Sequence, residues 1–189
     1  MFGNWFKKKP KRVYVPPAKA HLSAQAKATA IKAKPYSEKV LREIRRQVAG
    51  LIDVPKDEQT FISDEMIAAM QEGGNMHRMC WALEEIGISR ERVVEIAQGI
   101  HGSAKSLENI ERQREAGVLE ADWAHSGGKC FVRFPDDKEG EAKNALHQAA
   151  NGKRFNITKG LLIDGRWTFP GVEWGCKCTS RTILKGFND

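Results

Sequence analysis

The stretch from residue 151 to residue 169, NGKRFNITKGLLIDGRWTF, decides the fold class of this chain. It contains two turn signals, Asn151-Gly152 and Asp164-Gly165. Dipeptides of this kind favour tight turns, because both residues tolerate the positive φ that such turns require. Short apolar segments, residues 161–163 and 167–169, flank the second signal. The pattern predicts a β-hairpin with Asp164-Gly165 at its tip.

Two further strands and one helix are predicted around this hairpin. Residues 129–134, KCFVRF, alternate between apolar and polar side chains and predict a strand, and the last strand is expected within residues 176–184. Between them, residues 139–150 have helical spacing. The side chains expected to pack inward from this helix are Ala142, Ala145, Leu146 and Ala149.

The preceding part of the chain predicts successive short helices that end at glycines. Ser37 is a suitable N-cap and Gly50 a suitable stop for the first helix. Four more helices are expected over residues 63–72, 75–86, 89–99 and 103–116. The fold class is therefore α+β, with a helical subdomain at residues 37–104. A small antiparallel sheet with one packed helix follows at residues 105–189.

Residues 1–36 predict a basic and largely extended arm. The net charge of the chain is +7, yet no Asp or Glu precedes Glu38. Four prolines, Pro10, Pro16, Pro17 and Pro35, interrupt regular helix. An arm of this kind attracts polyanions such as DNA or an acidic protein surface; the alternative is a solvated leader. The candidate DNA-binding or partner-binding residues are Trp5, Phe6, Lys7, Lys8, Lys9, Lys11 and Arg12.

The four cysteines, Cys80, Cys130, Cys176 and Cys178, are too few and too unevenly spaced for a disulfide scaffold. Reduced thiols are typical of a protein made in the cytoplasm. No apolar run approaches the roughly 20 residues of a membrane helix, so no membrane partner is expected.

Cys176 and Cys178 could supply half of a tetrahedral zinc site if they share one face of a strand. The remaining ligands would come from Cys130, His125 or His147. The alternative, that both cysteines are buried small side chains, is favoured by the sequence, so no cofactor is expected.

A ribonuclease-like site is a second possibility for the same region. His125 and His147 could act as base and acid, and Lys153 could neutralise a phosphate. The favoured interpretation is instead that His147 braces the turn at Asn151-Gly152. Trp167 could likewise stack on a nucleic-acid base, although a hairpin tryptophan more often serves as core or as an interface anchor.

Three ordered motifs resemble the phage Mu F-like (MuF) minor head protein family. The first is Trp123-Ala124-His125-Ser126-Gly127. The second is His147 followed by residues 151–155, NGKRF, and the third is residues 170–178, PGVEWGCKC. The resemblance covers about residues 105–183. At Lys177 this family usually has arginine, so the charge is kept while the planar fork is lost.

The resemblance implies a virion component that acts in head morphogenesis. Its expected partners are the portal protein and the major capsid or scaffold protein, and its expected location is the capsid interior, with the host cytoplasm during assembly. Some MuF domains are toxin effectors, so a metal-independent nuclease acting on RNA is the alternative. The motif core expected from the family is Trp123, His125, His147, Gly152, Lys153, Cys176 and Cys178.

Overall fold

The computed structural model describes residues 12–16, 36–131 and 135–183 of the chain. By internal contacts the chain divides into two units, Met1–Lys32 and Ala33–Asp189. In the first unit, Arg12 begins the short described segment, which has neither helix nor strand. The other candidate binding residues of the arm, Trp5, Phe6, Lys7, Lys8, Lys9 and Lys11, lie outside the described residues. Their binding role stays a prediction.

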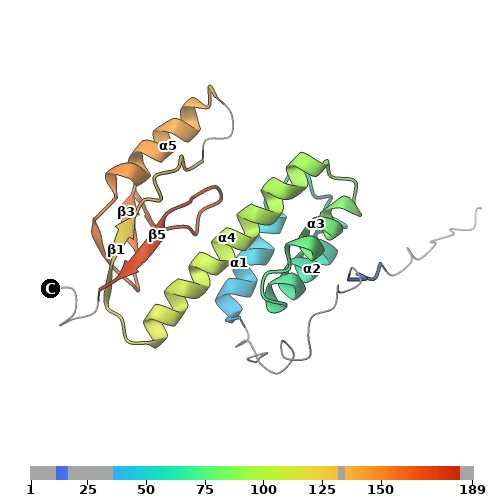
Figure 1. The fold of residues 1–189 in the computed structure, drawn as a ribbon, viewed down its shortest axis with the longest axis horizontal. Coiled ribbons are helices and arrows are strands. Elements are labelled where there is room, and N and C mark those ends of the chain that lie inside the picture. Colours follow the sequence, from blue (N-terminus) through green and yellow to red (C-terminus); the bar gives the residue numbers. More distant parts are fainter. Residues whose placement is uncertain (1–11, 17–35, 132–134, 184–189) are drawn as a thin grey trace, which may run out of the picture. The chain divides into compact units, whose positions relative to one another are not determined.

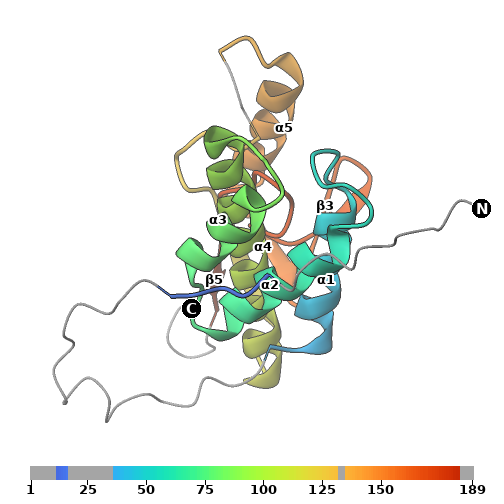
Figure 2. The same ribbon diagram turned by 90° about the vertical axis from the view of Figure 1, so that its right-hand side faces the viewer.

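The second unit begins with four helices: α1 (Glu38–Ala49), α2 (Gln59–Gln71), α3 (Met76–Glu84) and α4 (Arg90–Glu115). α1 and α3 pack against α4, and α2 packs against α1 and α3 (Figures 1 and 2). Ser37 caps α1 as predicted, since its hydroxyl accepts a hydrogen bond from the Val40 amide at 3.4 Å. α2 begins four residues earlier than the sequence pattern predicts.

The prediction of two helices over residues 89–116 is wrong, because α4 is one continuous helix of 26 residues. Its apolar face continues through the glycines, with Ile96, Ile100 and Leu107 buried on both sides of them. Gly99 does not end the helix; instead it leaves room for the ring of Trp174, which would lie 2.8 Å from an added Cβ. α4 therefore also crosses the predicted boundary between residues 104 and 105.

Five short strands follow and confirm the α+β fold class. β1 (Glu120–Ala124) lies between β2 (Arg154–Asn156) and β5 (Thr179–Thr182) in an antiparallel sheet of order β2-β1-β5. β3 (Leu161–Ile163) and β4 (Arg166–Thr168) form the predicted hairpin. At its tip the φ angles of Asp164 and Gly165 are +50° and +71°. This is the pattern of positive φ that the Asp-Gly signal requires.

The strand predicted at residues 129–134 is not present in residues 129–131, and residues 132–134 lie outside the described residues. The amide of Cys130 donates to the side chain of Asn144, and the amide of Phe131 donates to the Gly175 carbonyl. These amides are therefore not available to a strand ladder. The last strand starts at Thr179, so Cys176 and Cys178 precede it.

α5 (Lys138–Ala149) lies where predicted but buries a different face. Ala142, Ala145, Leu146 and Ala149, which were expected to pack inward, are exposed. The buried side chains of α5 are instead polar, Asn144 and His147. The apolar spacing was misleading because this helix covers a polar cluster and not an apolar core.

The second unit has two apolar cores. One is formed by α1–α4, and the other lies between the three-stranded sheet, the end of α4 and the segments around α5. Residues 170–178 contribute to both: Val172 and Trp174 pack on the helical core, and Cys176 packs on the sheet core. No helix of the described residues is both long enough and apolar enough to cross a membrane.

Candidate metal centre

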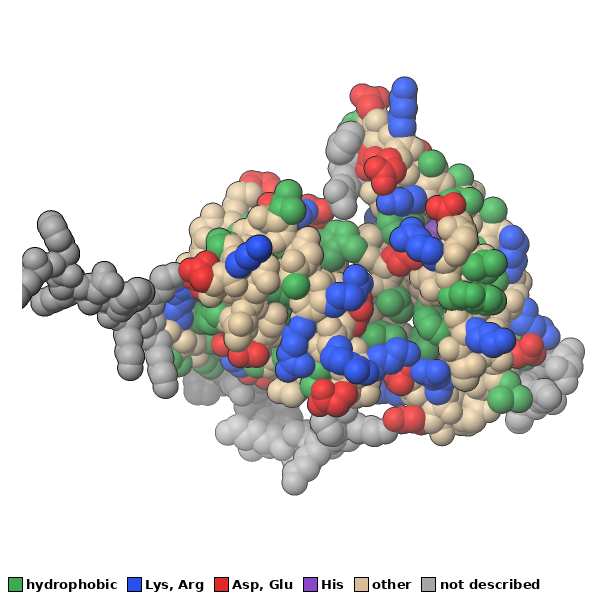
Figure 3. Space-filling view, turned by 180° about the vertical axis from the view of Figure 1, so that it is seen from behind, with side chains coloured by type: hydrophobic (Ala, Val, Ile, Leu, Met, Phe, Trp, Pro, Cys, Tyr) green, Lys and Arg blue, Asp and Glu red, His purple; other side chains and the backbone are tan. Residues whose placement is uncertain are grey.

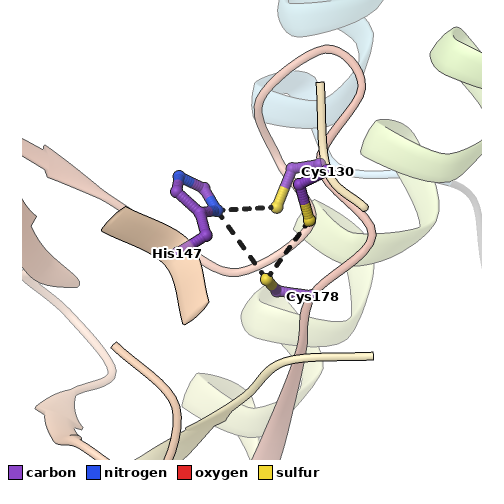
Figure 4. Close-up of side chains that lie close together, drawn as sticks. Cys130, His147 and Cys178 are labelled. Atoms are coloured by element: carbon purple, nitrogen blue, oxygen red, sulfur yellow. Dashed lines mark hydrogen bonds between the residues drawn. The ribbon is translucent and has the colours of Figure 1, made fainter. Parts of the chain in front are cut away.

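Four side chains from three separate segments converge beside the sheet. Cys130 lies between β1 and α5, His147 in the last turn of α5, and Cys176 and Cys178 just before β5. Their sulfur and ring nitrogen atoms all lie within 4.8 Å of one another. Figure 4 shows the imidazole of His147 and the sulfurs of Cys130 and Cys178 directed toward a common point. Together the four residues could hold a metal ion.

Three of the six distances between these atoms are close to the edges of a small tetrahedron. His147 Nδ1 lies 3.3 Å from Cys176 Sγ and 3.7 Å from Cys178 Sγ, and the sulfurs of Cys130 and Cys178 are 3.7 Å apart. A tetrahedral zinc ion with Zn–S bonds of about 2.3 Å and Zn–N bonds of about 2.0 Å has ligand–ligand edges of about 3.5–3.8 Å. Since all four ligand atoms lie within 4.8 Å of one another, small side-chain movements would let them coordinate such an ion.

Amide groups support the sulfurs from outside the cluster. The Lys177 amide donates to Cys130 Sγ at 3.2 Å, and the Gly171 amide donates to Cys176 Sγ at 3.3 Å. Hydrogen bonds from neutral donors to sulfur are stronger when the sulfur is a thiolate, which is the form that ligates a metal. The donors therefore suit a metal-bound state of both cysteines.

A further buried N–H group belongs to Trp123. Its side chain is fully buried, and its indole Nε1 has no hydrogen-bond partner among the described residues. Interaction with Trp123 also opposes the rise in the pKa of the Cys178 thiol. An unsatisfied buried N–H costs about 1–3 kcal/mol, and a thiolate at Cys178 would remove that cost.

The three thiols of the cluster differ in pKa. Hydrogen bonds from Cys176 and then Cys178 hold the pKa of Cys130 far below its ordinary value. Hydrogen bonds with Cys130 and then Cys178, together with burial, raise the pKa of Cys176 strongly. The hydrogen bond with Cys130, together with burial, raises the pKa of Cys178 to about 11, although its bond with Cys176 acts in the opposite direction. The three thiols therefore titrate together, and once one thiolate has formed its charge disfavours further thiolates. A cation with two positive charges would remove this repulsion.

Asn144 and His125 form a shell behind Cys130. Asn144 Oδ1 accepts from the Cys130 amide at 2.8 Å and lies 3.4 Å from His125 Nε2. The Gly127 amide donates to His125 Nδ1 at 3.1 Å, so His125 carries its proton on Nε2. That Nε2 is also 4.0 Å from Cys130 Sγ. His125 therefore lies next to the four candidate ligands, and Asn144 orients both Cys130 and His125.

The motif residues expected from the sequence hold this site together. The ring of Trp123 meets the His147 imidazole edge to face at 5.1 Å. The Gly152 amide donates to the Trp123 carbonyl at 2.7 Å, and the Trp123 amide donates to the Lys153 carbonyl at 2.9 Å. The side chain of Lys153 is exposed, so this residue contributes through its backbone.

Gly171 is required for the approach of the cysteine loop to α4. Its φ is +77°, and an added Cβ would lie 2.7 Å from the Cys178 carbonyl and would also collide with Ser106 of α4. A side chain at this position would therefore displace both the amide that donates to Cys176 and the backbone of Cys178.

The sequence identified most of the residues of the cluster but did not predict its geometry. His147, Cys176 and Cys178 meet as possible ligands, and Cys130, one of three candidates for the remaining positions, joins them. The assumption that Cys176 and Cys178 share a strand face is wrong, since both precede β5. Asn144 was missed, because an Asn inside a helix carries no signal of its own.

Fold and site together define an α+β protein with a candidate Cys₃His metal centre. No protein-family model matches the chain, and no curated protein or solved structure matches it either.

Proposed function

We propose that Cys130, His147, Cys176 and Cys178 bind a structural zinc ion. Four protein ligands leave no open position for a substrate or a water molecule, and a closed set of this kind is typical of structural zinc. When bound, zinc would cross-link three segments that are distant in sequence. The observation that carries the proposal is the close approach of the four ligand atoms, all within 4.8 Å of one another, together with the backbone N–H groups that donate to two of the sulfurs.

We further propose that the protein is a minor head component that acts in phage head morphogenesis. The support is that all three MuF-like motifs meet at this centre: Trp123 packs on His147, Gly152 bonds to Trp123, and Cys176 lies against His147. A shared set of fold-supporting contacts accounts for the presence of all three motifs in one chain. The proposed partners are the portal protein and the major capsid or scaffold protein, inside the virion.

The surroundings of His147 favour this structural role over the nuclease alternative. Its side chain is only 3% exposed, and its Nδ1 faces Cys176 and Cys178. A general base must reach a substrate proton within about 3 Å. Here the imidazole is enclosed by Trp123, Phe131 and the cysteine sulfurs.

Metal analysis of the purified full chain tests the zinc proposal. We expect about one zinc per chain after expression in zinc-supplemented medium, falling below about 0.2 in Cys178→Ser. Cys80→Ser is the matched control, because Cys80 lies in α3 outside the cluster, and it should retain the metal. Less than about 0.2 zinc per chain in the wild type, with all thiols free, would refute the proposal.

Co-purification with the portal protein, together with mass spectrometry of purified particles, tests the head function. We expect the chain in the particles and an association with the portal that survives moderate salt. Absence from both preparations would contradict the head function while leaving the zinc result unaffected. RNA cleavage that His147→Ala abolishes would instead support the nuclease alternative.

A further inference from the structure

Three arginines form the solvent-exposed face of α1. Arg42, Arg45 and Arg46 follow one another at helical spacing, on the side opposite to the buried residues Val40 and Ile44. Arg46 pairs with Glu43 at 2.6 Å, whereas no ion pair involves Arg42 or Arg45 among the described residues. The folded part of the chain thus has a helix face of concentrated positive charge.

This face continues into a groove between α1, α4, α5 and β4. The groove is lined by Arg46 from α1, by Arg166 and Trp167 from β4, and by Lys143 and Lys177. Arg166 and Lys177 make no ion pair with the described residues. Figure 3 shows Lys and Arg side chains following one another across this view of the molecule.

Four acidic residues also line the groove, and three of them are already engaged. Glu95 pairs with Arg92, Glu139 pairs with Lys143, and the Asp137 carboxylate accepts from the Gly140 amide. Glu173 is the fourth. Arg166 and Lys177 in the groove and Arg42 and Arg45 on the adjoining face of α1 make no ion pair among the described residues, while Asp137 and Glu173 keep their negative charge within the groove.

An exposed aromatic ring, that of Trp167, lines the same groove as Arg166 and Lys177. Trp167 is 61% exposed although it sits in a strand, and its cross-strand partner Leu162 is 54% exposed. Tryptophan usually buries its ring, and an exposed one next to cations can stack on an unpaired base. The combination of phosphate-binding cations and a stacking ring is that of a single-strand nucleic-acid groove.

From this geometry we infer that the α1 arginine face and the β4 edge of the groove bind single-stranded nucleic acid. Arg42, Arg45 and Arg166 contact phosphates, and Trp167 stacks on a base. This surface belongs to the folded unit and is distinct from the basic arm before Glu38. The inference depends on neither the proposed zinc ion nor the proposed role in head assembly.

Fluorescence anisotropy of the full chain with a fluorescein-labelled dT oligonucleotide of 20 nucleotides tests the inference. We expect the variant R42E/R45E/R166E to bind at least tenfold more weakly than wild type, with a salt dependence shallower by about two units of slope. Trp167→Ala should lose about 5- to 150-fold for dT but little for a hairpin duplex of the same length. It should also reduce the quenching of tryptophan fluorescence by dT.

Arg90→Glu is the matched control for charge, because Arg90 is exposed at the start of α4 and does not line the groove. The arm is identical in every variant, so its own contribution to binding cancels. The inference is overturned if the triple variant, folded by circular dichroism, loses no more affinity per reversed charge than Arg90→Glu. It is also overturned if Trp167→Ala weakens dT and duplex binding equally or leaves both unchanged.

Discussion

Asn144 occupies a position in α5 where the sequence pattern gives no reason for a buried amide. Its side chain is 9% exposed, and its oxygen accepts from the Cys130 amide while facing His125. Residues behind a metal ligand commonly fix the ligand's orientation, and their loss weakens metal binding by about 10–100-fold. Asn144 is placed to do this for Cys130.

We predict that Asn144→Leu weakens zinc binding by about 10–100-fold, because the Cys130 amide loses its acceptor and the ligand loses its fixed position. Competition with a chromophoric zinc chelator measures the change. Gln148→Leu also replaces a side-chain amide by leucine, but at an exposed site of α5, so this control should bind zinc like wild type. Equal affinity of the two variants would show that Asn144 does not position Cys130.

His101 in α4 gives a pH dependence that is separate from the metal centre. Burial, and then the charge of Lys105, lower its pKa below the ordinary value of 6.5. The unfolded chain therefore binds a proton on this imidazole at a higher pH than the folded chain does. The free energy of unfolding contributed by His101 is intact above pH 6.5 and is lost as the pH falls through that value.

We predict that the free energy of unfolding falls less steeply between pH 7 and pH 5 in His101→Gln than in wild type. Denaturant unfolding at several pH values, followed by circular dichroism, provides the measurement. Gln148→Leu, at an exposed site of α5, is the control that changes no titratable group and should keep the wild-type slope. If His101→Gln also keeps it, His101 is not responsible for acid destabilisation.

At the scale of elements, two glycines of α4 have different structural roles. Gly99 and Gly102 lie three residues apart in the same helix. An added Cβ at Gly99 would meet the Trp174 ring at 2.8 Å, whereas at Gly102 it would meet nothing within 4 Å. The first glycine is required by packing and the second is not.

We therefore predict opposite effects of alanine at these two positions. Gly102→Ala should stabilise the protein by about 1 kcal/mol, because alanine is the better helix former. Gly99→Ala gains the same helix propensity but must displace Trp174, and this overpacking costs about 1–3 kcal/mol. Its net effect on the free energy of unfolding should therefore be neutral or destabilising. Chemical denaturation measures both variants, and tryptophan fluorescence should shift only in Gly99→Ala. Stabilisation of equal size in both would contradict the packing of Trp174 on α4.

At the scale of the whole second unit, residues 170–178 connect the two cores. Val172 and Trp174 pack on the helical core, while Cys176 and Cys178 belong to the metal cluster. Ser180, just after this segment, accepts hydrogen bonds from Asn109 and Gln113 of α4 at 3.1 and 2.9 Å. Binding of zinc would hold one end of the segment and so steady its contacts with α4.

Removal of zinc by a chelator should therefore loosen the sheet core much more than the helical core. We predict faster hydrogen exchange in residues 120–131 and 170–182, with little change in α1–α3, and a red shift of tryptophan fluorescence. Far-UV circular dichroism should change little, because most of the helix lies in α1–α4. Loss of protection in all helices together would show instead that the two cores unfold as one unit.

Local pattern was sufficient for much of this protein. The cap at Ser37, the hairpin at Asp164-Gly165 and the α+β class depend on backbone preferences of a few adjacent residues, which the sequence displays directly. Cys176, Cys178 and His147 could be identified as candidate ligands from the sequence alone, because cysteine and histidine side chains bind metals whatever the local secondary structure.

Only the tertiary structure could decide three other features. Gly99 lies inside α4 and leaves room for Trp174, which is 75 positions away in the chain, instead of ending the helix. The buried face of α5 is polar because Asn144 and His147 meet groups from distant segments. The convergence of Cys130 with Cys176 and Cys178 arises from long-range packing. Such contacts leave no periodic signal in the sequence, because they join residues that are neighbours only after folding.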